Sequence, residues 1–134
     1  MSDVNDTIFA NKNESNIRIL AVDDEPISRF VIQTMLQDTN FAFDIVSEGD
    51  DAIEKAKSGE YSVVISDLNM PRTDGYEVVK NIKKYANENN KNIKVFALTA
   101  SDAAEIREKC KAAGFDGVII KGCSKEEVLN VIFN

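Results

Sequence analysis

Residues 62–71 have the sequence Ser-Val-Val-Ile-Ser-Asp-Leu-Asn-Met-Pro, a short β-branched run that ends at Asp67 and runs into a turn-forming proline. An apolar run without alternation is typical of a strand covered by helices on both faces of a parallel sheet. In doubly wound sheets of this kind, ligands bind outside the carboxyl ends of the strands. Asp67 is therefore the first candidate functional residue.

The rest of the chain repeats this pattern in both directions. Further β-branched runs predict strands at residues 17–22, 41–47, 94–99 and 117–121. Helical spacing predicts helices over 27–37 and 50–57, one starting after Gly75, one ending at Gly114, and one N-capped by Ser124 with Glu127 as its capping-box partner. The alternation predicts an α/β fold, a doubly wound parallel sheet of five strands with five helices.

In the helix at 27–37, apolar side chains recur as on the face of an amphipathic helix; they are Ile27, Phe30, Val31 and Met35. Of the two cysteines, Cys110 lies on the inner stripe of its helix and is expected to be buried. Cys123 follows the last strand and is the thiol whose reactivity is of interest.

Composition limits the classes of function. A chain of 134 residues fits one domain, with residues 1–16 predicted as a flexible leader and 17–134 as the folded unit. The net charge of −7 argues against binding nucleic acid through this domain. No apolar run approaches the roughly 20 residues that span a bilayer, and residues 1–16 lack a secretory signal. We therefore expect a cytoplasmic protein without membrane contact.

The strand ends bring chemically useful side chains to one edge of the predicted sheet. Asp23 and Asp24 follow the first strand, and Asp67, Thr99 and Lys121 end the third, fourth and fifth. Crowded carboxylates repel one another unless a cation lies between them, and all-oxygen ligands favour Mg²⁺. An ammonium group pairs with phosphate and a hydroxyl can donate to a phosphoryl oxygen. A carboxylate can also be the nucleophile that forms an aspartyl-phosphate.

The motifs at these positions resemble the receiver domain of two-component response regulators. The resemblance covers residue 17 to the C-terminus and rests on the sequences Val-Asp-Asp-Glu-Pro at 22–26, Asp-Leu-Asn-Met-Pro-Arg-Thr-Asp-Gly at 67–75, Leu-Thr-Ala at 98–100, and Lys121. It implies a flavodoxin-like sheet with strand order 2-1-3-4-5. It also implies a single-domain regulator or a segment of a larger hybrid kinase.

The same resemblance assigns roles to the metal ligands. It implies that Asp67 takes a phosphoryl group from a phosphohistidine on a histidine kinase or histidine phosphotransfer protein. Asp24, Asp67 and the backbone carbonyl of Asn69 would hold Mg²⁺, and Asp23 would act mainly through a metal-bound water.

The resemblance further implies a switch that passes the signal to a downstream effector protein or domain. Thr99 would move toward the phosphoryl oxygens, and Lys121 would pair with Asp67 before transfer and with the phosphoryl group after it. Such a domain catalyses only its own phosphorylation and dephosphorylation. Two positions depart from the family pattern: Val118 replaces the usual aromatic residue and Gly122 replaces the proline after the lysine.

Two alternatives stay open at this point. A Mg²⁺-dependent phosphohydrolase also forms an aspartyl-phosphate, but it needs a second carboxylate two residues beyond the nucleophile, where this chain has Asn69. A degenerate receiver that acts only as a binding module is the other, and Val118 favours it slightly.

Overall fold

A computed structural model describes residues 17–134, so the predicted leader at 1–16 lies outside the described residues. Five parallel strands form one sheet in the order β2-β1-β3-β4-β5. Their bounds are β1 Arg18–Val22, β2 Ala42–Val46, β3 Val63–Asp67, β4 Lys94–Thr99 and β5 Gly117–Ile120. The predicted fold class and strand order are confirmed.

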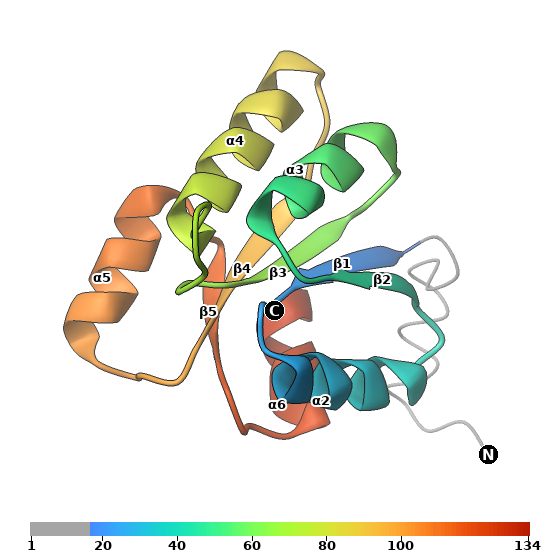
Figure 1. Cartoon of the computed structure of the whole chain (residues 1–134), viewed down its shortest axis with the longest axis vertical. Coiled ribbons are helices and arrows are strands. Elements are labelled where there is room, and N and C mark those ends of the chain that lie inside the picture. Colours follow the sequence, from blue (N-terminus) through green and yellow to red (C-terminus); the bar gives the residue numbers. More distant parts are fainter. Residues whose placement is uncertain (1–16) are drawn as a thin grey trace.

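Five helices cover the sheet in two layers, with α3, α4 and α5 on one face and α2 and α6 on the other (Figure 1). Their bounds are α2 Pro26–Gln37, α3 Gly49–Ser58, α4 Gly75–Glu88, α5 Ala104–Ala113 and α6 Lys125–Phe133. Ser124 and Glu127 form the predicted capping box of α6. None of the helices within residues 17–134 is both long and apolar enough to cross a bilayer.

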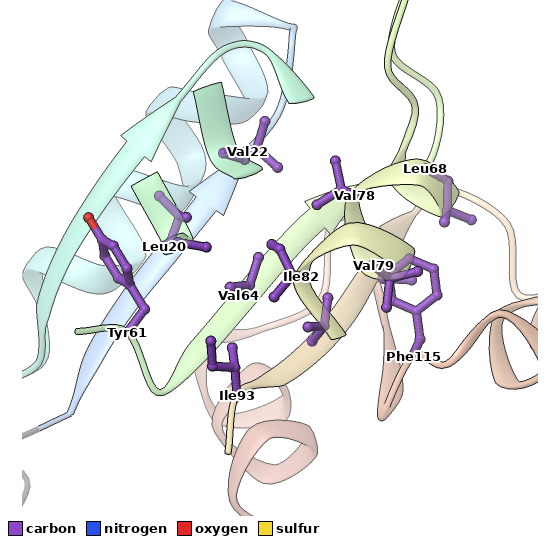
Figure 2. Close-up of a cluster of buried hydrophobic side chains, with 14 of the residues drawn as sticks. Leu20, Val22, Tyr61, Val64, Leu68, Val78, Val79, Ile82, Ile93 and Phe115 are labelled. Carbon is purple, nitrogen blue, oxygen red and sulfur yellow. The ribbon is translucent and has the colours of Figure 1, made fainter. Parts of the chain in front are cut away.

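The two faces of the sheet each have an apolar core. Beneath α3, α4 and α5, Leu20, Val64 and Ile82 are fully buried and form part of the cluster in Figure 2. Beneath α2 and α6, a second cluster includes Ile19 and Ile119. Because both faces are covered, the strand ends are the part of the sheet where polar side chains can gather.

The apolar stripe predicted on the first helix behaves differently from a core face. The helix itself is confirmed as α2, but Ile27 is 79%, Phe30 69% and Val31 47% exposed, and the fully buried side chain of α2 is Leu36. Pro26 occupies the first turn, as expected. Periodicity identified the helix correctly, whereas three of the four apolar side chains face solvent.

We predict that Ile82→Ala lowers the free energy of unfolding by about 2–5 kcal/mol, because it leaves a cavity where α4 packs on the sheet. Ile27→Ala makes the same change on an exposed face of α2 and is expected to alter it by less than about 0.5 kcal/mol. Urea denaturation of both variants measures the difference. Equal losses would contradict the assignment of Ile82 to the core and of Ile27 to the surface.

Candidate functional site

The carboxyl edge of the sheet gathers the predicted site residues. Asp67 and Thr99 are the last residues of β3 and β4, Asp23 and Asp24 follow β1, and Lys121 follows β5. Asp23 is fully buried, Asp67 is 4% exposed and Thr99 5% exposed. The strand register supports this convergence, since Asp67 pairs with Leu98 and Thr99 with Ile120.

Three carboxylates form a compact acidic group at this edge. Asp23, Asp24 and Asp67 each offer an oxygen atom, and these oxygens lie within 4.8 Å of one another. The Asp23 side chain is fully buried, and its Oδ2 lies 3.1 Å from the ammonium of Lys121. Carboxylates this close together repel one another, and an all-oxygen set of this size fits a hard divalent ion such as Mg²⁺.

Asp23 is held in place by its neighbours in the turn after β1. Its Oδ1 accepts a hydrogen bond from the backbone N–H of Glu25 at 3.0 Å. Its backbone carbonyl accepts one from Nη1 of Arg29 at 3.0 Å. The motif around the two aspartates gave no sign that Arg29, in the first turns of α2, anchors this turn.

Lys121 faces three of the nearby carboxylates. Its Nζ lies 3.1 Å from Oδ2 of Asp23, 3.6 Å from Oδ2 of Asp67 and 3.7 Å from Oε1 of Glu25. Burial lowers the pKa of Lys121, but Asp23, Asp67 and Glu25 together outweigh it and leave this pKa above its ordinary value. The predicted pairing with Asp67 is present, although Asp23 is the closer partner, and Glu25 was not predicted.

Asp67 has an unusually basic carboxylate. Burial, and then the negative charge of Asp23, raise its pKa from 3.8 to about 6. The charge of Lys121 and a hydrogen bond to Oδ1 from the Asn69 N–H, at 3.4 Å, oppose this rise. Near neutral pH the carboxylate is mostly ionised, as a nucleophile must be. The structure places the Asn69 N–H against Asp67, and the role of the Asn69 carbonyl as a metal ligand stays a prediction.

A close backbone contact fixes the segment after β3. The N–H of Gly75 donates to the Leu68 carbonyl at 3.0 Å, and a Cβ on Gly75 would collide with the carbonyl oxygen of Asp67. Only glycine allows this approach. Gly75, at the start of α4, therefore also positions the backbone of Asp67.

Thr99 is linked to the loop that follows it. Its Oγ1 accepts a hydrogen bond from the N–H of Ser101 at 3.2 Å, and its carbonyl accepts one from the N–H of Lys121 at 2.8 Å. The N–H of Ala103 in turn donates to Oγ of Ser101 at 3.2 Å. A movement of the Thr99 hydroxyl would thus disturb the backbone before α5.

The two cysteines and Val118 complete the predicted positions. Cys110 is fully buried, as expected. Cys123 is half-buried beside Lys121, and burial followed by the charge of Glu127 raises the pKa of its thiol. A raised pKa lowers the thiolate fraction, which argues against Cys123 as a reactive thiol. Val118 packs at the edge of the core beneath α5.

The fold and its edge define a class: a doubly wound α/β domain with a buried acidic site and a facing lysine at the carboxyl ends of its strands. The model of the response regulator receiver domain family matches residues 19–133. The chain therefore belongs to this family, the receiver domains of phosphorelay signalling.

Similar proteins agree with this assignment. The transcriptional regulatory protein ResD of Bacillus subtilis is 36% identical over 112 residues, which cover 84% of this chain and 45% of ResD. The sensor histidine kinase RcsC of Escherichia coli is 29% identical over 92% of this chain and 12% of RcsC. The chain thus spans less than half the length of these relatives.

Solved structures are also similar. The chemotaxis protein CheY4 of Vibrio cholerae is 29% identical with a TM-score of 0.77, over 87% of this chain and 95% of that one. The receiver domain of the sensor histidine kinase PA1611 of Pseudomonas aeruginosa is 27% identical with a TM-score of 0.77, over 87% of this chain and 94% of that one. That structure contains a magnesium ion coordinated in the active site cleft.

We predict that Asp67→Asn stabilises the metal-free protein at pH 7 by about 1–3 kcal/mol, because it removes a carboxylate that folding makes harder to ionise. The folded pKa of about 6 lies above the ordinary 3.8, so the native state binds more protons between these values. Wild-type stability should consequently fall as pH rises through this window, and the gain from Asp67→Asn should vanish near pH 4. Urea denaturation at a series of pH values measures both.

The matched control is Asp51→Asn, which neutralises an exposed carboxylate in the first turn of α3 that is not part of the acidic group of Asp23, Asp24 and Asp67. It is expected to change stability by less than about 0.5 kcal/mol at any pH tested. If Asp67→Asn lowered the free energy of unfolding at pH 7, this result would contradict the expectation that burial and the charge of Asp23 make the ionised Asp67 carboxylate unfavourable in the folded state.

Proposed function

We propose that Asp67 accepts a phosphoryl group from a phosphohistidine on a histidine kinase or histidine phosphotransfer protein, and that the reaction requires Mg²⁺. The observation that carries this proposal is the buried Asp67 carboxylate, placed between an acidic group and the ammonium of Lys121. An Asp67 oxygen would form the new bond to phosphorus while the bond from phosphorus to the histidine nitrogen breaks. The electron pair of that bond stays with the partner's imidazole.

The residues around Asp67 have distinct parts in this reaction. Asp23, Asp24 and the Asn69 carbonyl, together with Asp67, would hold Mg²⁺, whose charge offsets that of the phosphoryl oxygens. Lys121, 3.6 Å from Asp67, would pair with the phosphoryl group after transfer. Asp23, the closest partner of Lys121, keeps the ammonium at the site before transfer.

The alternatives are less well supported. Asn69 occupies the position where a phosphohydrolase needs its second carboxylate, and it offers no general acid or base. A binding module without phosphorylation does not require two buried carboxylates, Asp23 and Asp67, within reach of the half-buried Lys121 ammonium. We therefore favour a phosphorylation switch that turns over only its own phosphoryl group and acts on a downstream effector. Its location in the cytoplasm, without nucleic-acid or membrane contact, stays a prediction from composition.

We propose that the signal leaves through the loop before α5. Val118 has a short side chain, stiff at χ1, and cannot act as a moving ring. The Thr99 hydroxyl, by contrast, is hydrogen-bonded to the N–H of Ser101. Residues 100–104 are exposed, so a shift of Thr99 toward a phosphoryl group would change a surface that an effector can contact.

The exposed apolar face of α2 gives the phosphodonor protein a place to bind. Ile27, Phe30 and Val31 form this face, and a groove of about 170 Å³ continues from Ile27 and Val31 to Lys121 and Cys123. Large exposed apolar patches mark sites of protein interaction. A partner bound here would lie beside Lys121, whose ammonium is 3.6 Å from Asp67. The structurally similar receiver domain of Ssk1 from Saccharomyces cerevisiae has been crystallised with the phosphotransfer protein Ypd1.

The first test is intact-mass measurement after incubation with acetyl phosphate. We expect the wild-type protein to gain one phosphoryl group with Mg²⁺ and almost none with EDTA, and Asp67→Asn to gain none. Asp24→Asn should need a higher Mg²⁺ concentration, because it removes one of the few carboxylate ligands. Full phosphorylation of Asp67→Asn would show that the acceptor is a different residue.

A second test separates docking from chemistry. Phe30→Ala should slow transfer by about tenfold from a phosphorylated histidine phosphotransfer protein that modifies the wild type, because buried aromatic anchors dominate interfaces. Its rate with acetyl phosphate should stay unchanged, since this small donor does not need the α2 face. Gln37→Ala, at the exposed far end of α2, is the control. An equal effect of Phe30→Ala on both donors would contradict a docking role.

A further inference from the structure

Lys121 lies in a tight turn between β5 and α6. The N–H of Cys123 donates to the carbonyl of Ile120 at 3.2 Å, which closes a four-residue turn with Lys121 second and Gly122 third. Gly122 has a φ of 95°. Within residues 17–134, the non-glycine residues with a positive φ are Arg72 and Asn90. A positive φ at the third position, with a φ at the second that is not positive, is the φ pattern of a type II turn.

This turn constrains position 122 through the backbone alone. A residue with a Cβ is disfavoured at positive φ, and glycine or asparagine is the usual choice there. A Cβ built on Gly122 would meet nothing within 4 Å. A substitution at this position therefore changes the preferred φ without creating a steric clash.

The turn holds the base of the Lys121 side chain from both directions. On one side, the N–H of Lys121 donates to the carbonyl of Thr99 at 2.8 Å, which extends the pairing of β4 with β5. On the other side, the turn closes at Cys123. Held in this way, the ammonium reaches Asp23 at 3.1 Å and Asp67 at 3.6 Å.

We propose that Gly122 is a positioning residue for phosphoryl transfer, because its left-handed backbone conformation closes the turn that directs Lys121 into the acidic site. This inference rests on the proposed function of Asp67. Proline, which usually follows the lysine in the family that the sequence resembles, cannot adopt this φ.

The test measures the rate of phosphorylation by acetyl phosphate with Mg²⁺ for three variants and the wild type. Gly122→Ala should be slower by about fivefold, since alanine disfavours the left-handed region and the turn opens in a fraction of molecules. Gly122→Asn should stay within about twofold of the wild type, because asparagine tolerates positive φ. This rescue depends on φ and not on the size of the side chain.

Gly114→Ala is the matched control. Gly114 has a φ of 108° where it ends α5, so the same substitution imposes a similar backbone strain away from Lys121. We expect a lowered melting temperature for this variant but a phosphorylation rate like that of the wild type. All rates are measured below the melting temperature of each variant.

Several results would overturn the proposal. Gly122→Ala at the wild-type rate would do so, as would Gly122→Asn as slow as Gly122→Ala. An equal slowing by Gly114→Ala would assign the effect to general stability. If the wild type itself is not phosphorylated, the proposed function of Asp67 fails and this inference fails with it. If the wild type is phosphorylated and Gly122→Ala is equally fast, only this inference fails.

Discussion

The structure depends on keeping two carboxylates, Asp23 and Asp67, out of water at one edge of an apolar sheet. Such burial is costly unless a positive charge compensates for it. Lys121 supplies part of that charge, 3.1 Å from Asp23 and 3.6 Å from Asp67. Burial and then the charge of Asp23 raise the pKa of Asp67 by more than Lys121 lowers it, so repulsion between the two carboxylates is only partly offset. This residual repulsion makes the edge receptive to a divalent cation.

A parallel sheet with helices on both faces provides the rigidity that this charge arrangement needs. Leu20, Val64 and Val95 are fully buried on one face, and Ile19 and Ala21 on the other, so the strands that carry the site have little freedom to separate. Stability and function therefore have different locations. The apolar faces stabilise the fold, whereas the strand ends hold groups that destabilise it until a ligand binds.

Much of this arrangement could be predicted from sequence, because parallel strands place their carboxyl ends together whatever their exact bounds. The convergence of Asp67, Thr99 and Lys121 follows from this rule alone. Other features depend on tertiary packing. The exposure of Phe30 is one, since periodicity identifies an apolar face but not what covers it. The contact of Arg29 with the Asp23 carbonyl is another, because a surface arginine on a helix carries no pattern that names its acceptor.

Two glycines connect the sequence to the placement of the reactive charges. Gly75 lets α4 begin against the carbonyl of Asp67, which fixes the backbone of the acceptor. Gly122 allows the turn that follows Lys121, and there the constraint is φ rather than space. The acceptor at the end of β3 and the ammonium just after β5 are thus both positioned by the backbone.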